Sequence, residues 1–321
     1  MTLAQAVPFP GLPTAFLVTA LAGLFAVPTL RRLRAGQQVR EQGPQAHRTK
    51  AGTPTSGGII FLIGLAAAVL IFQNDRVDAL LVLGLTWAFG ALGAVDDLMK
   101  VRRRSSLGLR ARDKLLWGTA IVVAFGLCAQ RFAGLTDTIL IPGRGDSIRL
   151  GVWLLPFLWL VVLGTTNAVN LADGLDGLAT GLGMTALAAF AVITLHTGPL
   201  PLASVSLSMA GALAAFLIYN LHPARVFMGD SGSFAIGAAL AGIAILSRTE
   251  LYLLVVGGVF VLEALSVIAQ VISFKVWHRR ILRMSPLHHH FELSGMPETR
   301  VVSLFWVLGL ACAALALVGV R

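Results

Sequence analysis

The sequence is a succession of long apolar runs separated by short polar stretches. A helix needs ~20 apolar residues to cross the ~30 Å hydrocarbon core of a membrane, and runs of about that length recur along the whole chain. We therefore predict an all-α, polytopic membrane protein with about ten transmembrane helices. The predicted spans are 12–30, 57–73, 78–95, 115–131, 151–169, 178–196, 202–219, 233–247, 251–274 and 301–320.

The composition agrees with this pattern. Charged residues make up 12% of the 321 residues, whereas a soluble protein carries about 25%. We treat residues 1–321 as a single transmembrane helical domain. The first apolar run has its basic residues after it rather than before it, which does not fit a cleaved signal peptide. Cys128 and Cys312 both fall inside apolar runs and are interpreted as small core residues.

The positions of Lys and Arg predict the topology. Loops that follow odd-numbered spans hold 19 of the 25 basic residues, and basic loops stay in the cytoplasm. The predicted cytoplasmic loops are 31–57, 96–114, 167–181, 220–233 and 275–300, with both termini extracytoplasmic. This bias, together with attraction to anionic lipid, explains the net charge of +10 without nucleic-acid binding.

The outer segment 132–150 differs from the cytoplasmic loops. Its I-P-G-R-G-D run has turn chemistry and predicts a short hairpin. It contains no candidate catalytic group.

Residues 167–181, N-A-V-N-L-A-D-G-L-D-G-L-A-T-G, concentrate polar side chains between two apolar runs. Asn167, Asn170 and Asp173 recur every three residues, so on a helix each would lie ~60° from the last and form one polar stripe. Capping of the next helix by Asp176 is the structural alternative. Capping does not require the asparagines, so we interpret this stretch as one wall of a phosphate-handling site.

Two further clusters lie beside the second and third spans. The loop G-P-Q-A-H-R-T-K-A-G-T-P-T-S-G-G offers the cation of Lys50 and the hydroxyl of Thr55, although an ordinary basic loop remains an alternative. Asp96 and Asp97 close the third span, where their like charges repel and the helix dipole is unfavourable. A surface ion pair with Lys100 would account for one of these carboxylates but not for both.

Two more clusters lie later in the chain. In V-F-M-G-D-S-G-S, Asp230 sits between glycines that let a ligand approach the backbone closely, and either serine could cap the next helix. In S-P-L-H-H-H-F-E, three consecutive residues, His288, His289 and His290, would point ~100° apart on a helix. Because that spacing does not suit zinc, we interpret them as an anion-binding or proton-donating surface, with a bland loop as the alternative.

The predicted topology places the T-P-T-S-G-G, D-G-L-D-G and G-D-S-G-S stretches at helix N-termini on one face. Free N–H groups and the helix dipole favour anions there. Carboxylates beside an anion site would repel the anion unless a cation lies between them. Mg²⁺ prefers oxygen ligands and combines one or two protein groups with substrate phosphates. The residues therefore predict a phosphate or diphosphate site that uses Mg²⁺.

Glu263 lies within the ninth predicted span and stands apart from these clusters. A carboxylate inside a span can be a proton or ion site. It can equally be structural, bonded to Ser266 or Gln270 on the same helix, and the sequence leaves both readings open.

Together, these five motifs resemble a known family. Their order and content are similar to the bacterial phospho-N-acetylmuramoyl-pentapeptide-transferases, a branch of the polyprenyl-phosphate N-acetylhexosamine-1-phosphate transferases. The resemblance extends from about Arg40 to the last span, and P-L-H-H-H-F-E with G-M-P-E points to the muramoyl branch. Ser56 replaces a usual Met and Ser231 a usual Val, and neither change removes a chemical group.

The resemblance implies a ten-helix protein, a homodimer, that uses Mg²⁺. Its substrates would be UDP-MurNAc-pentapeptide and undecaprenyl phosphate, and its products lipid I and UMP. Asp230 would hold Mg²⁺, with Asn170 as a further ligand, and Asp96 and Asp97 would meet the lipid phosphate. The expected nucleotide-sugar contacts are Lys50, Thr55, Asp173, Asp176, Phe227 (stacking on uracil) and the three histidines His288, His289 and His290.

Two other functions stay open at this point. Within the same class, the chain could be a GlcNAc-1-phosphate transferase. From another class, it could be an ion-coupled transporter built on Glu263, although transporters place their polar groups near the bilayer midplane and here they gather at one face. For the transferase, a single in-line displacement is our hypothesis, and a two-step route with a carboxylate nucleophile remains the alternative.

Overall fold

The computed structural model describes residues 9–32, 52–103, 105, 107–141 and 146–320. Most of this part of the chain is helical, as predicted. The elements are α1 (Gly11–Arg32), α2 (Gly58–Phe72), α3 (Val77–Arg103), α4 (Ala111–Phe132), β1 (Thr138–Leu140), β2 (Ser147–Arg149), the 3-10 helix η3 (Gly151–Trp153), α5 (Leu154–Ala172), α6 (Leu178–Thr197), α7 (Leu200–Asn220), α8 (Gly229–Leu246), α9 (Glu250–Val256), α10 (Gly258–Trp277), α11 (Leu287–Leu293) and α12 (Glu298–Val318).

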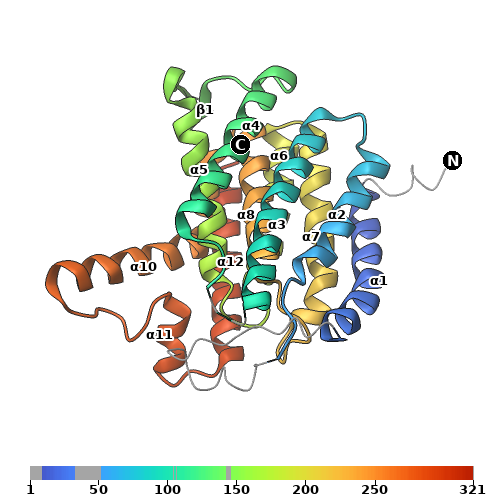
Figure 1. Ribbon diagram of the computed structural model, residues 1–321. Helices are drawn as coiled ribbons and strands as arrows, with labels where there is room; N and C mark the ends of the chain where they lie inside the picture. The colour runs from blue at the N-terminus through green and yellow to red at the C-terminus, as the bar shows by residue number, and fades with distance from the viewer. Residues whose placement is uncertain (1–8, 33–51, 104, 106, 142–145, 321) are drawn as a thin grey trace.

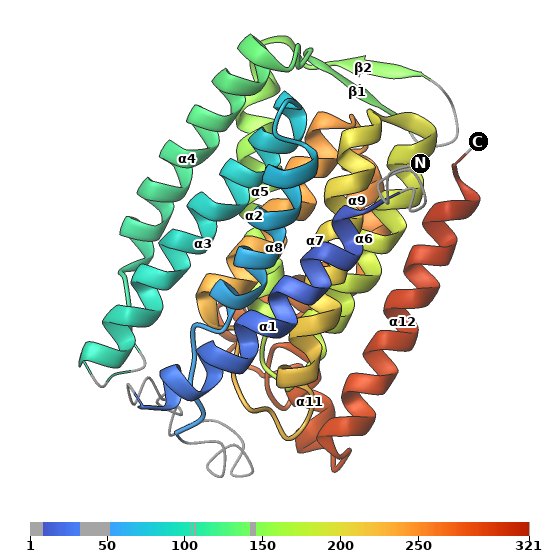
Figure 2. The same cartoon turned by 90° about the vertical axis from the view of Figure 1, so that its right-hand side faces the viewer.

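The helices form one bundle (Figures 1 and 2). Within the described residues, nine helices are long and apolar enough to cross a membrane, and the shorter α2 occupies the place of the second predicted span. The prediction of a polytopic all-α membrane protein is thus confirmed. The start of α1, the end of α12 and the β1–β2 hairpin lie at one end of the bundle, and α11 lies at the other (Figure 2).

Helix α8 forms the centre of the bundle and packs against α3 and α5. Its sequence is rich in Gly, Ala and Ser, which lets neighbouring helices approach closely. A Cβ on Gly93 of α3 would overlap with the backbone of Asp230 at the start of α8. On another side, a Cβ on Gly58 of α2 would overlap with the backbone of Gly232. These contacts bring the polar ends of α2 and α3 to the N-terminus of α8.

Two predicted spans differ most from the structure. The third, 78–95, continues to Arg103 as α3, so Asp96 and Asp97 are helical residues rather than loop residues. The ninth, 251–274, is divided at Gly257 into α9 and α10, because a pair of glycines at 257–258 weakens the helix there. Beyond this break, α10 leaves the bundle and projects sideways (Figure 1).

The predicted outer hairpin is present. Strands β1 and β2 pair antiparallel with Thr138 opposite Arg149. The Arg149 guanidinium donates a hydrogen bond to Asp137 at 2.8 Å, and this bond lowers the pKa of the Asp137 carboxyl.

Candidate active site

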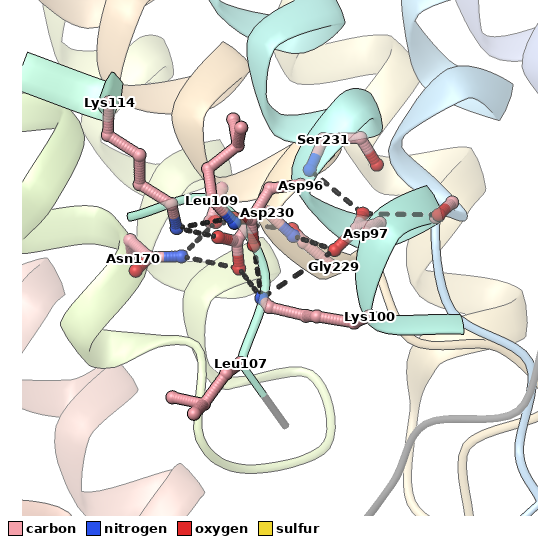
Figure 3. A network of polar contacts seen from close by, with 12 residues as sticks. Asp96, Asp97, Lys100, Leu107, Leu109, Lys114, Asn170, Gly229, Asp230 and Ser231 are labelled. Carbon is pink, nitrogen blue, oxygen red and sulfur yellow. Dashed lines mark hydrogen bonds and ion pairs between the residues drawn. The ribbon is translucent and has the colours of Figure 1, made fainter. Parts of the chain in front are cut away.

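Three carboxylates meet at the junction of α3 and α8 (Figure 3). Asp96 and Asp97 come from the last two turns of α3 and Asp230 from the first turn of α8. One oxygen atom from each lies within 4.8 Å of the others. The structure therefore brings together the three carboxylates that the resemblance assigns to Mg²⁺ and to the lipid phosphate.

Asp97 has a specific place in this group. Its carboxylate accepts the backbone N–H groups of Asp230 at 3.0 Å and of Ser231 at 3.1 Å, so it caps the N-terminus of α8 from another helix. It also accepts the Ser56 hydroxyl at 3.1 Å. The alternative of a cap by a serine of α8 is wrong, because Ser231 and Ser233 instead donate their hydroxyls to backbone carbonyls of the preceding turn.

Two lysines neutralise the other two carboxylates. Lys100 lies 2.7 Å from Asp96 and 2.9 Å from Asp230. Lys114, at the start of α4, lies 3.1 Å from Asp96 and 2.8 Å from Asp230. The backbone N–H of Leu109 adds a bond to Asp96 at 2.6 Å. Both ammonium groups thus bridge the same pair of buried carboxylates.

These residues suit a metal ion. Carboxylate oxygens are hard ligands, and the bridging ammonium groups show that Asp96 and Asp230 are spaced to share a cation. Asn170 lies beside them, but it meets Asp230 through its amide nitrogen, at 3.2 Å, and donates to Ser233 at 2.9 Å. In this arrangement Asn170 orients Asp230, and its carbonyl oxygen would have to turn to become a metal ligand.

The T-P-T loop joins the site through its backbone. Phe227 donates its N–H to Pro54 at 2.8 Å and accepts the N–H of Gly57 at 2.9 Å. This pairing places the buried Thr55 hydroxyl and the carboxylate of Asp97 against Gly229, where a Cβ would overlap with both. The φ of Gly229 is +69°, a conformation that favours glycine.

A second polar group forms where the turn before α6, the loop after α7 and the start of α12 meet. The Asp176 carboxylate accepts the N–H of Ala224 at 3.0 Å and lies 3.0 Å from Nδ1 of His222. Glu298 accepts the N–H of Asp176 at 2.8 Å. Asp176 therefore does not cap α6, as the alternative reading of the sequence had it, but joins three segments of the chain.

Asp173 follows the last residue of α5 and lies between the two acidic groups. Burial raises the pKa of its carboxyl well above the usual value, and the charges of Asp230, Asp97 and Asp176 raise it further, while Lys100 opposes them. These surroundings favour the protonated form of Asp173 more than water does.

Glu263 contacts the segment that carries the histidines. Its carboxylate accepts the N–H of Leu287 at 2.8 Å and lies 3.2 Å from Nδ1 of His288. The predicted same-helix partners are wrong: Ser266 donates to the backbone carbonyl of Glu263, and Gln270 binds the loop after α10. Glu263 therefore links two segments.

The three histidines do not act as one surface. His288 is fully buried, whereas His289 and His290 are partly exposed. Nδ1 of His289 lies 2.8 Å from Glu292, and Nδ1 of His290 accepts the N–H of Arg283 at 3.1 Å. The burial of His288 does not fit an anion-binding surface, whereas His289 and His290 are partly accessible.

Six of the twelve predicted site residues fall into two groups at this end of the bundle. The carboxylate and lysine group includes Thr55, Asp96, Asp97, Asn170 and Asp230, and the second is built around Asp176. Lys50 lies outside the described residues. Sequence reasoning missed the roles of Lys114, His222 and Glu298.

Comparisons with known proteins identify similar chains. Residues 79–248, which include the three carboxylates, match the family described as glycosyl transferase family 4. A phospho-N-acetylmuramoyl-pentapeptide-transferase of Desulforamulus reducens is 48% identical over 95% of this chain and 93% of its own. Proteins of the same name from Halalkalibacterium halodurans and Moorella thermoacetica are 46% and 48% identical, covering 94% and 93% of this chain and 94% of each relative.

Proposed function

The chain belongs to the phospho-N-acetylmuramoyl-pentapeptide-transferases, and on that premise we propose how its site works. It transfers phospho-MurNAc-pentapeptide from UDP-MurNAc-pentapeptide to undecaprenyl phosphate, giving lipid I and UMP in peptidoglycan synthesis. The observation that carries this proposal is the pair of buried carboxylates, Asp96 and Asp230, bridged by Lys100 and Lys114 at one end of a membrane bundle. Such a group can bind phosphates and a cation at the edge of the lipid phase.

The acceptor needs little chemical activation. A phosphate monoester has a second pKa of about 6, so the lipid phosphate is largely a dianion at neutral pH. One of its oxygens attacks the phosphorus bonded to the sugar, the bond from that phosphorus to the bridging oxygen breaks, and UMP leaves with that oxygen. Positioning and charge neutralisation then dominate catalysis.

The residues divide this work. Lys100 and Lys114 meet phosphate oxygens, and Asp96 orients the acceptor and takes any residual proton. Asp230 would hold Mg²⁺, with Asn170 beside it, and the ion would neutralise charge on the diphosphate. Asp97 keeps Asp230 in place through the N-terminus of α8.

The nucleotide-sugar binds on the side of the second group. Asp173, Asp176 and Phe227 lie on the segments that would line the bound nucleotide-sugar, together with Thr55 of the T-P-T loop and with His289 and His290. Lys50 precedes that loop in the sequence, outside the described residues, and its contact with the nucleotide-sugar belongs to the same proposal. Support comes from the backbone pairing of Phe227 with that loop and from the charges of both acidic groups that act on Asp173.

The chain is a multi-pass bacterial membrane protein. We propose that the site faces the cytoplasm, with both termini extracytoplasmic, because the basic loops are predicted to lie on that side. Localisation to the cytoplasmic membrane and assembly as a homodimer belong to the same proposal. Labelling of single cysteines placed near Gly11 and near the T-P-T loop, by a membrane-impermeant thiol reagent on intact cells, tests the orientation.

The activity is tested with the purified full chain and undecaprenyl phosphate. We expect radiolabel to pass from UDP-MurNAc-pentapeptide into the lipid, with one UMP released for each lipid formed, and no transfer from UDP-GlcNAc. Transfer from UDP-GlcNAc alone would overturn the choice of sugar. A covalent phospho-sugar adduct on Asp96, Asp97 or Asp230 would overturn the one-step route. Substrate-dependent flux into liposomes without UMP would favour the transporter.

A further inference from the structure

Glu263 is a fully buried carboxylate that the proposed reaction does not use. It lies in α10, the helix that projects from the bundle (Figure 1). One of its oxygens accepts the N–H of Leu287, the first residue of α11, at 2.8 Å, and the other lies 3.2 Å from Nδ1 of His288. Helix α10 is therefore tied to the segment that carries the three histidines.

These contacts set where the ring proton of His288 lies. An ionised carboxylate accepts hydrogen bonds and cannot donate them. Glu263 accepts the N–H of Leu287 through one oxygen; with the second oxygen accepting as well, Nδ1 of His288 carries the proton and Nε2 is the acceptor nitrogen of a neutral ring. Nε2 is buried and has no hydrogen-bond partner in the described part of the chain.

Nε2 of His288 faces the turn between α5 and α6. A Cβ on Gly174 would overlap with this atom, so the ring fills the space that the glycine leaves open. A proton on Nε2 would be a buried donor pressed against a Cα atom, and buried donors without acceptors are rare. The packing against Gly174 and the bond to Glu263 thus favour the same tautomer.

We propose that Glu263 is a positioning residue for the transfer reaction. It holds His288 in the tautomer with the proton on Nδ1, and through that ring it fixes α11 against the turn that carries Asp173. His289 and His290 follow in the same helix, so their placement toward the nucleotide-sugar depends on Glu263. The role in turnover rests on the proposed function, whereas the tautomer does not.

Glu263→Gln tests the proposal because the substitution keeps the shape of the side chain. The backbone N–H of Leu287 can only donate, so it takes the amide oxygen. The amide NH₂ then faces Nδ1 of His288, which must become an acceptor. We expect the ring proton to move to Nε2, the buried side that faces Gly174. A purely structural loss of packing would not reverse the tautomer.

The first measurement is the ring ¹⁵N spectrum of the full-length protein labelled at histidine, with His288→Asn to identify the signal among the seven histidines. We expect protonated Nδ1 and bare Nε2 in the unsubstituted protein, and the reverse in Glu263→Gln. A bare Nδ1 in the unsubstituted protein, or an unchanged spectrum in the variant, would overturn the assignment. The unsubstituted spectrum alone decides the tautomer if the variant does not fold.

The second measurement compares KM for the two substrates. We expect Glu263→Gln to raise KM for UDP-MurNAc-pentapeptide about tenfold, by analogy with the effect of losing the outer hydrogen-bond partner of a metal-bound histidine, with KM for undecaprenyl phosphate within about twofold. Glu250→Gln is the matched control, because Glu250 is also buried but lies on α9, which precedes the Gly257 break and contacts β1. A reversed tautomer with both KM values unchanged, or an equal loss in Glu250→Gln, would overturn the positioning role.

The two levels of the proposal fail in different ways. If the unsubstituted protein does not release UMP from UDP-MurNAc-pentapeptide, the proposed function is wrong. The ¹⁵N spectrum then still decides whether Glu263 sets the tautomer of His288. If UMP is released and the spectrum disagrees, the inference about Glu263 is wrong and the proposed function stands.

Discussion

The carboxylate of Asp97 accepts the backbone N–H of Asp230 at 3.0 Å. Asp97, near the end of α3, therefore caps α8, the helix that carries Asp230. A carboxylate is favoured at a helix N-terminus, where free N–H groups and the dipole attract negative charge. The contact gives the two neighbouring aspartates of α3 different roles: Asp97 orders the site, and Asp96 faces the two lysines.

Asp97→Asn should destabilise the protein and lower its activity together. The amide has one acceptor oxygen, while Asp97 accepts from the N–H groups of Asp230 and Ser231 and from the Ser56 hydroxyl. Leaving a buried donor unpaired costs about 1–3 kcal/mol, and the thermal unfolding temperature should fall accordingly. Asp75→Asn, an exposed residue paired with Arg76, is the control, because surface ion pairs contribute little. An unfolding temperature as high as that of the control would contradict the capping role.

Asp230→Asn should abolish turnover while the protein stays folded. The cap of α8 comes from Asp97, so the helix keeps its N-terminal hydrogen bonds. The substitution removes the carboxylate shared by Lys100 and Lys114, and we expect UMP release to fall by about a hundredfold or more. Binding of Mn²⁺, followed by electron paramagnetic resonance, should be lost as well. Near-normal turnover or metal binding would show that Asp230 does not hold the ion.

Lys114→Met should change metal binding and catalysis in opposite directions. The Lys114 ammonium now occupies the space between Asp96 and Asp230, so its removal leaves more negative charge for a divalent ion. Mn²⁺ should bind more tightly in the absence of substrate, while UMP release falls about tenfold or more because a phosphate partner is lost. Arg112→Met is the matched control on the same helix, since the Arg112 side chain is 76% exposed. Weaker Mn²⁺ binding in Lys114→Met would mean that the lysine does not compete with the ion.

The parts of the site that were predictable are those encoded locally. Apolar run lengths predicted the spans. The i+4 spacing offered the ion pair between Asp96 and Lys100 as a surface alternative, and the structure contains that pair with Asp96 fully buried. The contact of Asp97 with α8 joins residues 133 positions apart, so no local pattern could indicate it. Lys114 lies in a basic stretch that looks like any cytoplasmic loop. Only the close approach of α3 and α8 at Gly93 makes these residues neighbours.

The partners of Glu263, the carboxylate inside a predicted span, could not be predicted from local sequence either. The sequence offered partners for Glu263 on its own helix, at the helical spacings of Ser266 and Gln270. Its partners instead lie on α11, because the loop after α10 returns to the bundle and places Leu287 and His288 beside it. The break at Gly257, which the apolar pattern conceals, directs α10 away from the bundle.

Asp173 should make the stability of the protein depend on pH. Burial and the charges of Asp230, Asp97 and Asp176 raise the pKa of its carboxyl above the usual value. Below about pH 3.9, the carboxyl is protonated in both the folded and the unfolded protein, so it contributes no pH dependence. At higher pH the unfolded protein loses the proton first, so the folded state binds more protons and stability falls as pH rises, until the folded pKa is passed.

Asp173→Asn has no titrating group at this position, so comparison with the unsubstituted protein isolates the pH dependence that Asp173 contributes. The unfolding temperature of the unsubstituted protein, relative to that of Asp173→Asn, should decline as pH rises from about 4 toward neutrality, measured in detergent with divalent ions chelated. Asp137→Asn is a control of opposite sign, since the hydrogen bond from Arg149 lowers the pKa of Asp137. The stability that Asp137 contributes is present above its usual pKa and is lost as pH falls. The difference in unfolding temperature between Asp173→Asn and the unsubstituted protein could instead stay constant over this range. That result would mean that the pKa of Asp173 is not raised in the folded protein.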